Sequence, residues 1–183
     1  IRDIEFLGDD NIYFAGKRRG YSTFLKSVNG GVDWSQTGLD SYQEVHDLVV
    51  VSKSIFLVAL GSEIKKTTDG GESWYAVEIN SDSSVQANEM CFPSADIGYA
   101  VCSGAMDNML KTYDGGESWE SLNTNVTANL TAVHFFDENH GIVMGENGII
   151  LRTDNGGTTF IEEQPAIPAE PSAITLFPNP VTD

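Results

Sequence analysis

A nine-residue motif that occurs four times constrains the fold of this chain more than any other feature. The four copies are KSVNGGVDW, KTTDGGESW, KTYDGGESW and RTDNGGTTF, which end at Trp34, Trp74, Trp119 and Phe160. Their final aromatic residues are 40, 45 and 41 residues apart (74 − 34, 119 − 74 and 160 − 119). A period of this length is the signature of a protein built from repeated supersecondary units. The motif is therefore either a reaction site or a structural turn that is used four times.

Short apolar segments recur in phase with the motif. A first strand is expected at DIEF (3–6), MCF (90–92) and AVHFF (132–136), and a second at YFAG (13–16), YAVC (99–102) and IVMG (142–145). A third strand is expected to lead into each motif at TFLK (23–26), EIKK (63–66), NMLK (108–111) and IILR (149–152). A fourth is expected to start at each motif aromatic and to continue through WSQTG, WYAVEI, WESLN or FIEEQ. The second unit, with HDLVVVSKSIFLVAL, follows this template less closely.

Four short strands per unit predict an all-β fold of β-propeller blades, each a sheet of four antiparallel strands. Such a sheet is apolar on both faces and must stack on neighbouring sheets. The expected repeats are about 1–38, 39–80, 81–124 and 125–164. A β-solenoid would repeat at a shorter period, and an immunoglobulin-like sandwich would not repeat its turn sequence four times. We expect four blades to form an arc or a fragment of a larger propeller.

The residue types of the motif favour a turn over a reaction site. Each Gly-Gly pair can supply the positive φ of a tight reversal, and the Asp or Asn before it can accept hydrogen bonds from the backbone of the turn. An acid catalyst would lose its chemistry on becoming an amide, whereas a turn would not. The aromatic residue is Trp or Phe, which share packing but not the indole N–H. The predicted turn residues are Asn29, Gly30, Gly31, Trp34, Asp69, Gly70, Gly71, Trp74, Asp114, Gly115, Gly116, Trp119, Asn155, Gly156, Gly157 and Phe160.

These motifs resemble the Asp-box, or BNR repeat, of sialidases, sortilin-like receptors, xyloglucan-cleaving glycosidases and photosystem II assembly-factor propellers. The stretch AVHFFDENHGIVMGENGIILRTDNGGTTF is most similar to the last group, and the resemblance covers about residues 1–164. It implies that the motif is a structural turn at the blade periphery, away from catalytic residues. It also implies more blades than four.

The end of the chain differs in composition from the repeats. Five of the six prolines lie beyond residue 164, and residues 165–173 are expected to form a stiff, extended linker. Residues 174–183, ITLFPNPVTD, resemble the start of the C-terminal sorting domain of the type IX secretion system of Bacteroidota, and an ordinary Pro-rich tail is the alternative. The matching residues are Leu176, Phe177, Pro178, Asn179, Pro180 and Asp183. The resemblance implies a secreted or cell-surface protein and the type IX export machinery as a partner of the parent protein.

The charge of the chain argues against some partners. Ten Lys and Arg against 27 Asp and Glu give a formal net charge of −17, which repels nucleic acid and anionic membrane surfaces. Apolar runs such as Leu48–Val51 are far shorter than the roughly 20 residues of a membrane-spanning helix. We therefore expect neither nucleic-acid binding nor membrane insertion.

No catalytic, cofactor or metal site is predicted from the residues. A sialidase-type cluster of three arginines cannot be assembled, because Arg18 and Arg19 fit a solvated turn and Arg152 occupies the Lys position of its motif. Carboxylates such as Glu44, Asp47, Glu89 and Glu146 are too numerous for a catalytic pair to be chosen. His46, His134 and His140 are too scattered for a ligand pattern, and no motif supports a calcium site, although acidic loops leave calcium open. Cys91 and Cys102 could face each other across a hairpin as a disulfide or remain two buried thiols.

Two functional hypotheses remain. The first is a non-catalytic, secreted or cell-surface β-propeller that acts as a binding or scaffold module for a protein or glycan at its loops. The second is a fragment of a secreted glycoside hydrolase of the sialidase or xyloglucanase type, with catalytic residues partly outside this chain.

Overall fold

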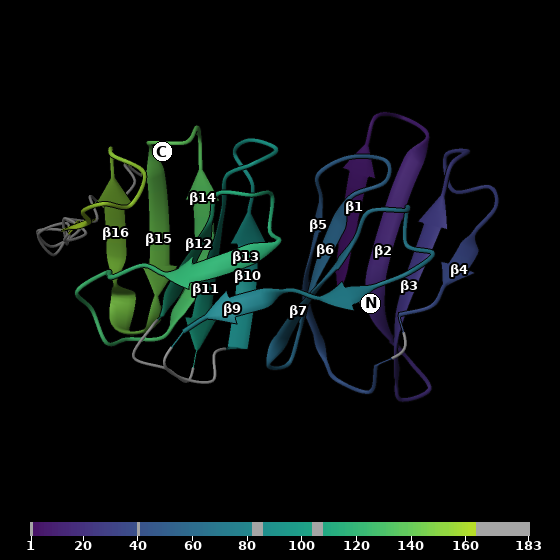
Figure 1. Cartoon of the computed structure of the whole chain (residues 1–183), viewed down its shortest axis with the longest axis horizontal. Helices are drawn as coiled ribbons and strands as arrows, with labels where there is room; N and C mark the ends of the chain where they lie inside the picture. Colours follow the sequence, from purple (N-terminus) through teal and green to yellow (C-terminus); the bar gives the residue numbers. More distant parts are fainter. Residues whose placement is uncertain (1, 40, 82–85, 104–107, 164–183) are drawn as a thin grey trace, which may run out of the picture.

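The computed structural model describes residues 2–39, 41–81, 86–103 and 108–163. The described residues form four sheets that follow one another along the chain and stack side by side (Figure 1). The all-β class with four-stranded antiparallel sheets is therefore confirmed. The expected linker (165–173) and the expected sorting motif lie outside the described residues. No helix among the described residues is long and apolar enough to span a membrane.

Each sheet is a meander in which consecutive strands pair. Sheet one contains β1 (Asp3–Leu7), β2 (Asn11–Arg18), β3 (Tyr21–Ser27) and β4 (Ser35–Thr37). Sheet two contains β5 (Val45–Val50), β6 (Phe56–Leu60), β7 (Glu63–Thr67) and β8 (Tyr75–Ala76). Sheet three contains β10 (Gln86–Cys91), β11 (Gly98–Ser103), β12 (Met109–Thr112) and β13 (Ser118–Ser121), and β9 (Glu78–Asn80) adds a fifth strand. Sheet four contains β14 (Leu130–Phe135), β15 (Gly141–Gly145), β16 (Ile150–Thr153) and β17 (Ile161–Glu162), and one 3₁₀ turn, η1 (Glu146–Gly148), precedes β16.

The segment WYAVEI departs from the expectation of one continuous fourth strand. It divides into β8, which pairs with β7 in sheet two, and β9, which pairs in parallel with β13 of sheet three, with Trp119 opposite Ile79. The outer edge of β13 would otherwise present unpaired N–H and C=O groups, and β9 covers that edge. The prediction of a single strand was wrong here because the second partner strand comes from the next repeat.

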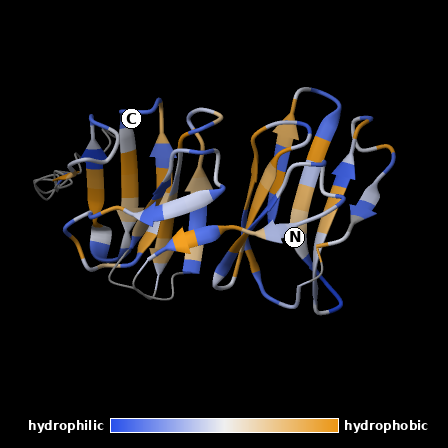
Figure 2. Ribbon diagram, viewed as in Figure 1, coloured by the Kyte–Doolittle hydropathy of each residue, from blue (hydrophilic) through white to orange (hydrophobic). Residues whose placement is uncertain are grey.

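The core lies between the sheets rather than within one of them. Between sheets one and two it contains Phe24 and Leu48, between sheets two and three Leu57 and Leu110, and between sheets three and four Tyr99. The apolar positions follow the strands and the polar ones gather in the turns (Figure 2). Each sheet therefore buries apolar side chains from both faces wherever it has two neighbours.

Pairing within equivalent hairpins gives the four sheets one common register. The residues opposite the last residue of the third strand are Ile12, Phe56, Gly98 and Gly141. Equivalent positions in different sheets can thus be compared directly. The first strands β1, β5, β10 and β14 contact one another in sequence, and the sheets form an open arc rather than a closed ring.

Two loop faces border this arc. The Gly-Gly face carries the four motif turns, here called Gly-Gly turns, and the turns that join first to second strands. The link face carries, among the described residues, turns that join second to third strands, such as residues 18–21, and parts of the links between sheets, such as residues 41–44. Successive strands alternate in direction, so the two sets of turns lie at opposite ends of the strands.

Cys91 and Cys102 do not face each other. The hairpin of β10 and β11 forms as expected, but Cys91 lies opposite Tyr99 and Cys102 lies opposite Ala87. The two cysteines are not joined by a disulfide. The disulfide alternative was wrong because the loop between the strands sets a register that separates the two positions.

Candidate binding site on the link face

The Gly-Gly turns are closed hydrogen-bonded units. In sheet three the buried Thr112 hydroxyl donates to Asp114 Oδ1 at 2.7 Å and accepts from the Gly116 N–H at 2.8 Å. The Asp114 carboxylate then accepts from the N–H of Ser118 at 3.0 Å. Gly115 and Gly116 have φ values of 71° and 88°, a region that side chains rarely enter.

Asparagine replaces aspartate in two of these turns and keeps the acceptor role of Oδ1, while its amide donates where the second Asp oxygen accepts. Asn29 Oδ1 accepts from the Asp33 N–H at 2.9 Å, and Asn155 Oδ1 accepts from the Thr159 N–H at 3.0 Å. In the aspartate version, hydrogen bonds from Ser73 hold the pKa of Asp69 well below its usual range. The side chain acts as an acceptor in both versions, which fits a structural turn.

Each Gly-Gly turn is also tied to its surroundings. Its first Gly N–H donates to a carbonyl of the turn between first and second strands, as Gly115 does to Asp96 at 2.8 Å. The cation at the start of the motif reaches the next sheet: Lys26 and Lys111 donate to the carbonyls of Gly70 and Gly156 at 2.8 and 2.7 Å. These turns therefore join neighbouring sheets.

The motif aromatics pack toward the preceding sheet. Trp119 packs against sheet two and is 1% exposed, whereas Trp34, on the end sheet, is 46% exposed. The indole N–H of Trp34 donates to the Gly31 carbonyl at 3.0 Å, but the buried Trp119 Nε1 has no partner among the described residues. Packing is thus the common role of this position, which Phe160 shares.

A row of carboxylates links the first strands. Asp3, Asp47 and Glu89 lie opposite Ala15, Ala59 and Val101, which are equivalent positions in three sheets. Asp3 accepts from the Leu48 N–H of the next sheet at 3.0 Å, and Asp47 accepts from the Met90 N–H at 2.7 Å. Each of these two bonds joins one sheet to the next, as the Lys contacts do on the Gly-Gly face.

Crowding of these acids favours the protonated form. Burial, together with the nearby Asp3 and Glu89 carboxylates, raises the pKa of Asp47 to about 8, against the opposing effect of the Met90 N–H. Burial also raises the pKa of Glu89. Neighbouring carboxyls that share a proton are known from catalytic sites. Here, however, Asp3 and Asp47 each accept a hydrogen bond from a backbone N–H group.

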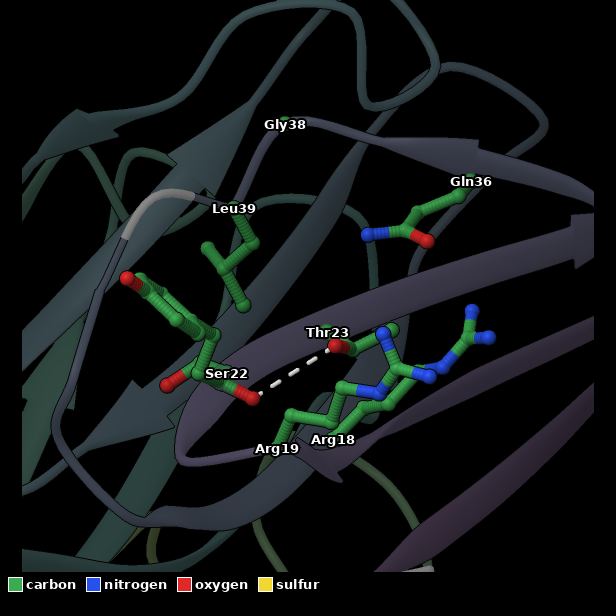
Figure 3. A pocket seen from close by; sticks show the side chains of 8 residues that line it. Arg18, Arg19, Ser22, Thr23, Gln36, Gly38 and Leu39 are labelled. Atoms are coloured by element: carbon green, nitrogen blue, oxygen red, sulfur yellow. Dashed lines mark hydrogen bonds between the residues drawn. The ribbon is translucent and has the colours of Figure 1, made fainter.

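A pocket of about 310 Å³ opens on the link face of sheet one. Its lining combines Arg18 and Arg19 from the β2–β3 turn with Ser22, Thr23, Gln36 and Leu39 (Figure 3). Both arginine side chains extend toward the Gln36 side of the pocket (Figure 3). Within the described residues neither guanidinium forms a salt bridge, although the chain as a whole carries a charge of −17. Two guanidinium forks in one pocket match the geometry of a carboxylate or another oxyanion.

The backbone of this turn places Arg19 under strain. Arg19 has φ 53° and Gly20 has φ 92°, so both central residues of the two-residue hairpin are left-handed. Asn125 and Asn147 are the other residues besides glycine with positive φ in the described chain, and asparagine tolerates this region well. Arginine does not, and strained residues of this kind concentrate at functional sites.

An aromatic pair borders the same pocket. Tyr21 lines it and packs against Tyr42 with tilted rings whose centroids are 4.5 Å apart, and the Tyr42 hydroxyl donates to that of Tyr21 at 3.0 Å. Tyr21 is 49% exposed and Tyr42 is 71% exposed. Exposed tyrosines that keep a polar end in water are suited to recognition of peptides and sugars.

A second polar cleft lies where the link ends of three sheets meet. It measures about 350 Å³ and is lined by Arg2, Asn88, Ser103, Asn129, Thr131 and Glu146. Arg2 Nε donates to the carbonyl of His46 at 3.1 Å, and the Gln86 amide lies 2.7 Å from His46 Nε2. Burial lowers the pKa of His46. The link face therefore carries this polar cleft in addition to the arginine pocket.

The histidines and acids do not assemble a metal centre in the part of the chain that the structure describes. His140 pairs with Asp137 at 2.9 Å in an exposed turn, and His134 lies against Phe136. Glu44 lines a separate cleft with Arg2, and Glu146 lines the cleft described above. Of the acids singled out in the sequence, the structure brings only Asp47 and Glu89 into one row.

Sequence reasoning missed both the arginine pocket and the carboxylate row. Arg18 and Arg19 were interpreted as a solvated turn, although two adjacent cations in so acidic a chain were a usable signal. The row could have been found by aligning DIEF with HDLVV and NEMCF, where an acid recurs at one register position. The role of that acid depends on the neighbouring sheet.

Comparison with known proteins agrees with this architecture. Residues 83–154, within sheets three and four, match the model of a family described as photosynthesis system II assembly factor YCF48. No curated protein sequence matches the chain significantly.

Solved structures of β-propeller proteins superpose on the chain. YCF48 bound to D1 peptide has a TM-score of 0.57 at 20% identity, over 66% of this chain and 40% of that one. YCF48 from Cyanidioschyzon merolae gives 0.57 at 20% identity, over 70% and 39%. The GH74 enzyme of Niastella koreensis gives 0.64 at 18% identity, over 84% and 27%.

At these identities the likeness shows the fold, and the chain spans less than half the length of these structures. The class of protein is thus a β-propeller module. At the family level, its third and fourth sheets are similar to YCF48.

Proposed function

We propose that this chain is a non-catalytic binding module that recognises a carboxylate-bearing ligand through the arginine pocket of the link face. The observation that carries the proposal is the pair of guanidinium groups, Arg18 and Arg19, in one pocket of a strongly acidic chain. The strained φ of Arg19 supports it, because a glycine at that position would be conformationally easier.

The ligand we propose is an acidic segment of a protein, with an acidic glycan as the alternative source of the same carboxylate. One solved structure similar to this chain is YCF48 bound to D1 peptide, which makes a peptide partner the first class to test. The Tyr21–Tyr42 pair would pack against the apolar part of such a ligand beside its carboxylate.

Binding of two probes would test the proposal. Isothermal titration of the full chain with a glutamate-rich peptide and with an oligogalacturonate should show binding of at least one, and the corresponding amidated or esterified probes should not bind. The affinity should fall as NaCl is raised, because the contact is between opposite charges. The peptide and glycan arms separate the two sources of carboxylate.

Matched variants localise the contact. Replacing Arg18 and Arg19 together by Gln should weaken binding at least about tenfold, the scale of one lost charged hydrogen bond. The single variants Arg18→Gln and Arg19→Gln are compared with the control Arg152→Gln, because each removes one positive charge and Arg152 is an exposed arginine on sheet four, outside this pocket. Equal effects of the pocket and control variants would contradict the assignment, as would tight binding of the uncharged probes.

The glycoside hydrolase hypothesis makes a different prediction. It requires two carboxylates free to act as acid and base, or as acid and nucleophile. Asp3 and Asp47 are instead acceptors for backbone N–H groups of the next sheet. Release of reducing ends from xyloglucan by the full chain, abolished by Asp47→Asn, would replace the binding proposal by the enzymatic one.

We also propose export of the parent protein, on the sequence of residues 174–183 alone. The test is to fuse the C-terminal part of the parent protein to a reporter in a bacterium that has the type IX system. Secretion that is lost when Pro178 and Pro180 are replaced by Ala would support the proposal, and unchanged secretion would contradict it.

A further inference from the structure

The positive charges of this chain are unevenly distributed. Four of its ten Lys and Arg residues are exposed at the link end of sheet one: Arg2, Lys17, Arg18 and Arg19. Within the described residues none of the four forms a salt bridge. Exposed cations without a carboxylate partner are therefore concentrated at one place in a chain whose net charge is −17.

Most of the other cations have a partner. Three pair with glutamates and two donate to carbonyls of Gly-Gly turns, in the order Lys65, Lys66, Arg152, Lys26 and Lys111. Lys53, in the turn between β5 and β6, is exposed and forms no salt bridge within the described residues. One such lysine is ordinary for a protein surface, whereas four clustered cations in a strongly acidic chain indicate an anionic ligand.

A cleft of about 190 Å³, here called the basic cleft, adjoins the arginine pocket. Its lining consists of Arg2, Gly16, Lys17, Glu44 and Val45. Lys17 lies opposite Ser22 in the β2–β3 ladder, and Ser22 lines the arginine pocket. The end of one hairpin thus lines both openings, and the consecutive residues Lys17 and Arg18 contribute to different ones.

The link to sheet two holds the pocket and the basic cleft in a fixed relation. The Ser22 hydroxyl donates to the Gln43 carbonyl at 2.6 Å, and the Ser22 N–H donates to the Ser41 carbonyl at 2.8 Å. These bonds attach the link to β3, with Tyr42 packed against the pocket and Glu44 in the basic cleft. A ligand that enters both openings therefore meets a surface whose backbone is already positioned.

We propose that the arginine pocket and the basic cleft are two subsites for one ligand, which places a carboxylate in each. The proposal rests on the function proposed above and narrows the ligand to a chain that carries at least two carboxylates. Arg18 and Arg19 would hold the first carboxylate, and Arg2 and Lys17 the second. Arg2 keeps donors for this role, because Nε is the atom that bonds to the His46 carbonyl.

A protein segment fits these two subsites better than a polyuronate does. The Tyr21–Tyr42 pair beside the pocket suits a ligand that mixes apolar with acidic units. A polyuronate carries a charge on every unit, and Glu44 in the basic cleft would repel such a dense array. We therefore take an extended acidic segment of a protein as the ligand.

The net charge of the chain does not prevent such binding. Exposed charges farther apart than about 8 Å are largely screened at physiological ionic strength. Acids elsewhere on the molecule thus act weakly on a ligand at the link end, whereas the four cations would contact it directly. Glu44 is the acid that lines the basic cleft, and its carboxylate should weaken the second subsite.

Strand geometry limits the spacing of the two carboxylates. Lys17 and Ser22 lie on neighbouring strands, which are about 4.8 Å apart, and an extended peptide rises about 3.3 Å per residue. The reach of the cationic side chains adds to the first distance. Glutamates roughly two to four residues apart along an extended segment should therefore reach both subsites.

The main experiment is isothermal titration of the full chain with three peptides of equal length. One carries a single glutamate, one carries two adjacent glutamates, and one carries two glutamates three residues apart, with glutamine at the alternative positions. The spaced pair should bind at least about tenfold more tightly than the single glutamate and severalfold more tightly than the adjacent pair, which has the same charge.

The outcomes separate this proposal from the one on which it rests. Equal affinity of the spaced and adjacent pairs would overturn the two-subsite proposal but leave recognition by the arginine pocket in place. Absence of binding by all three peptides and by an oligogalacturonate would overturn both. Tighter binding of the oligogalacturonate than of the spaced pair would overturn the choice of a protein segment.

Matched variants assign the second carboxylate to the basic cleft. Lys17→Gln should bring the affinity of the spaced pair close to that of the single glutamate, and should change binding of the single glutamate by less than about twofold. The control is Lys53→Gln, which removes the same charge at an exposed turn residue. Arg18→Gln, in contrast, should weaken binding of both peptides. Equal effects of Lys17→Gln and Lys53→Gln would contradict the assignment.

One variant should strengthen binding. Glu44→Gln removes the carboxylate that lines the basic cleft and should tighten binding of the spaced pair severalfold, with little effect on the single glutamate. Glu72→Gln is the control, since it removes the same charge from an exposed residue of a Gly-Gly turn. Equal effects of the two variants would show that the second carboxylate does not enter the basic cleft.

Discussion

The two loop faces of this molecule differ in the hydrogen bonding of their polar groups and in the backbone conformation of their turns. On the Gly-Gly face, hydroxyl, carboxylate and backbone N–H groups bond to one another within each turn, and glycine occupies the left-handed positions. On the link face of sheet one, arginine occupies a left-handed position and two guanidinium groups share an open pocket. The comparison teaches that the repeated motif forms closed, hydrogen-bonded turns, whereas the pocket proposed for recognition lies where hydrogen bonding is incomplete and the backbone of one residue is strained.

The largest expected loss comes from crowding a Gly-Gly turn. In Gly116→Ala the new methyl group would lie 2.5 Å from Leu57 Cδ2 of sheet two, at a φ of 88° that disfavours alanine. Left-handed strain and overpacking together should cost about 2–5 kcal/mol of unfolding free energy. Urea denaturation followed by tryptophan fluorescence measures it.

Gly30→Ala is the matched control for that variant. Gly30 also has a positive φ, 67°, but nothing lies within 4 Å of the added carbon. Gly30→Ala should lose only the free energy of left-handed backbone strain, which lowers the unfolding free energy by about 1 kcal/mol. Equal losses in the two variants would mean that contact between sheets through the turn is unimportant.

The next largest loss of stability should come from removing the hydroxyl at the centre of a Gly-Gly turn. Thr112→Val keeps the shape of a fully buried side chain but removes the acceptor of the Gly116 N–H and the donor to Asp114. We expect a loss of about 1–3 kcal/mol in the same denaturation experiment, because a buried N–H is left unpaired. Thr127→Val, at an exposed link-face position, should change stability little. A neutral Thr112→Val would contradict the closed hydrogen-bond network.

The carboxylate row beneath the link face should make stability depend on pH. The pKa of Asp47 is raised to about 8 in the folded chain by burial and by the neighbouring carboxylates. Its contribution to stability is therefore fully present below the unfolded pKa of roughly 4 and is lost as pH rises through about 8.

Asp47→Asn tests this contribution, because an amide oxygen can still accept from Met90 N–H while carrying no charge. The variant should be more stable than the parent chain at pH 9 and nearly equal to it at pH 4, and the difference should grow as pH rises from about 4 to about 8. Melting temperatures across this pH range measure the difference. Greater stability of the parent at pH 9 would contradict the raised pKa.

The smallest expected change in stability comes from replacing Arg19, the strained residue of the link face. Arg19→Gly should stabilise the chain by up to about 1 kcal/mol, because glycine accepts φ 53° without the strain of a side chain. The same change should weaken binding of the carboxylate probe. Gain of stability with loss of binding would identify a residue kept for function, and loss of both would assign Arg19 a structural role.

Much of the fold could be predicted because it depends on local and repeated signals. Gly-Gly pairs such as Gly115 and Gly116 require positive φ wherever they occur, and the apolar segments around them recur in phase. The binding pocket could not be predicted in the same way. Arg18 is joined there by Gln36 and Leu39, from β4 and the link to sheet two, and no local pattern indicates that juxtaposition.

The register between strands was likewise beyond the sequence. Cys91 and Cys102 lie in the expected hairpin, yet they face other residues. Residues 78–80 follow a Gly-Gly turn of sheet two and nevertheless pair with sheet three. The first result depends on the loop between β10 and β11, and the second on which backbone edge is free when neighbouring repeats stack.

The sequence by itself determined four sheets, their strand order and the turns that join their third and fourth strands, because hairpin geometry is set by residues close together in the chain. Only the tertiary structure decided that Asp3 and Asp47 bond to the next sheet and that Arg18 and Arg19 share an open pocket. The physical reason is that burial and electrostatic surroundings are properties of the stacked sheets, which a single repeat does not contain.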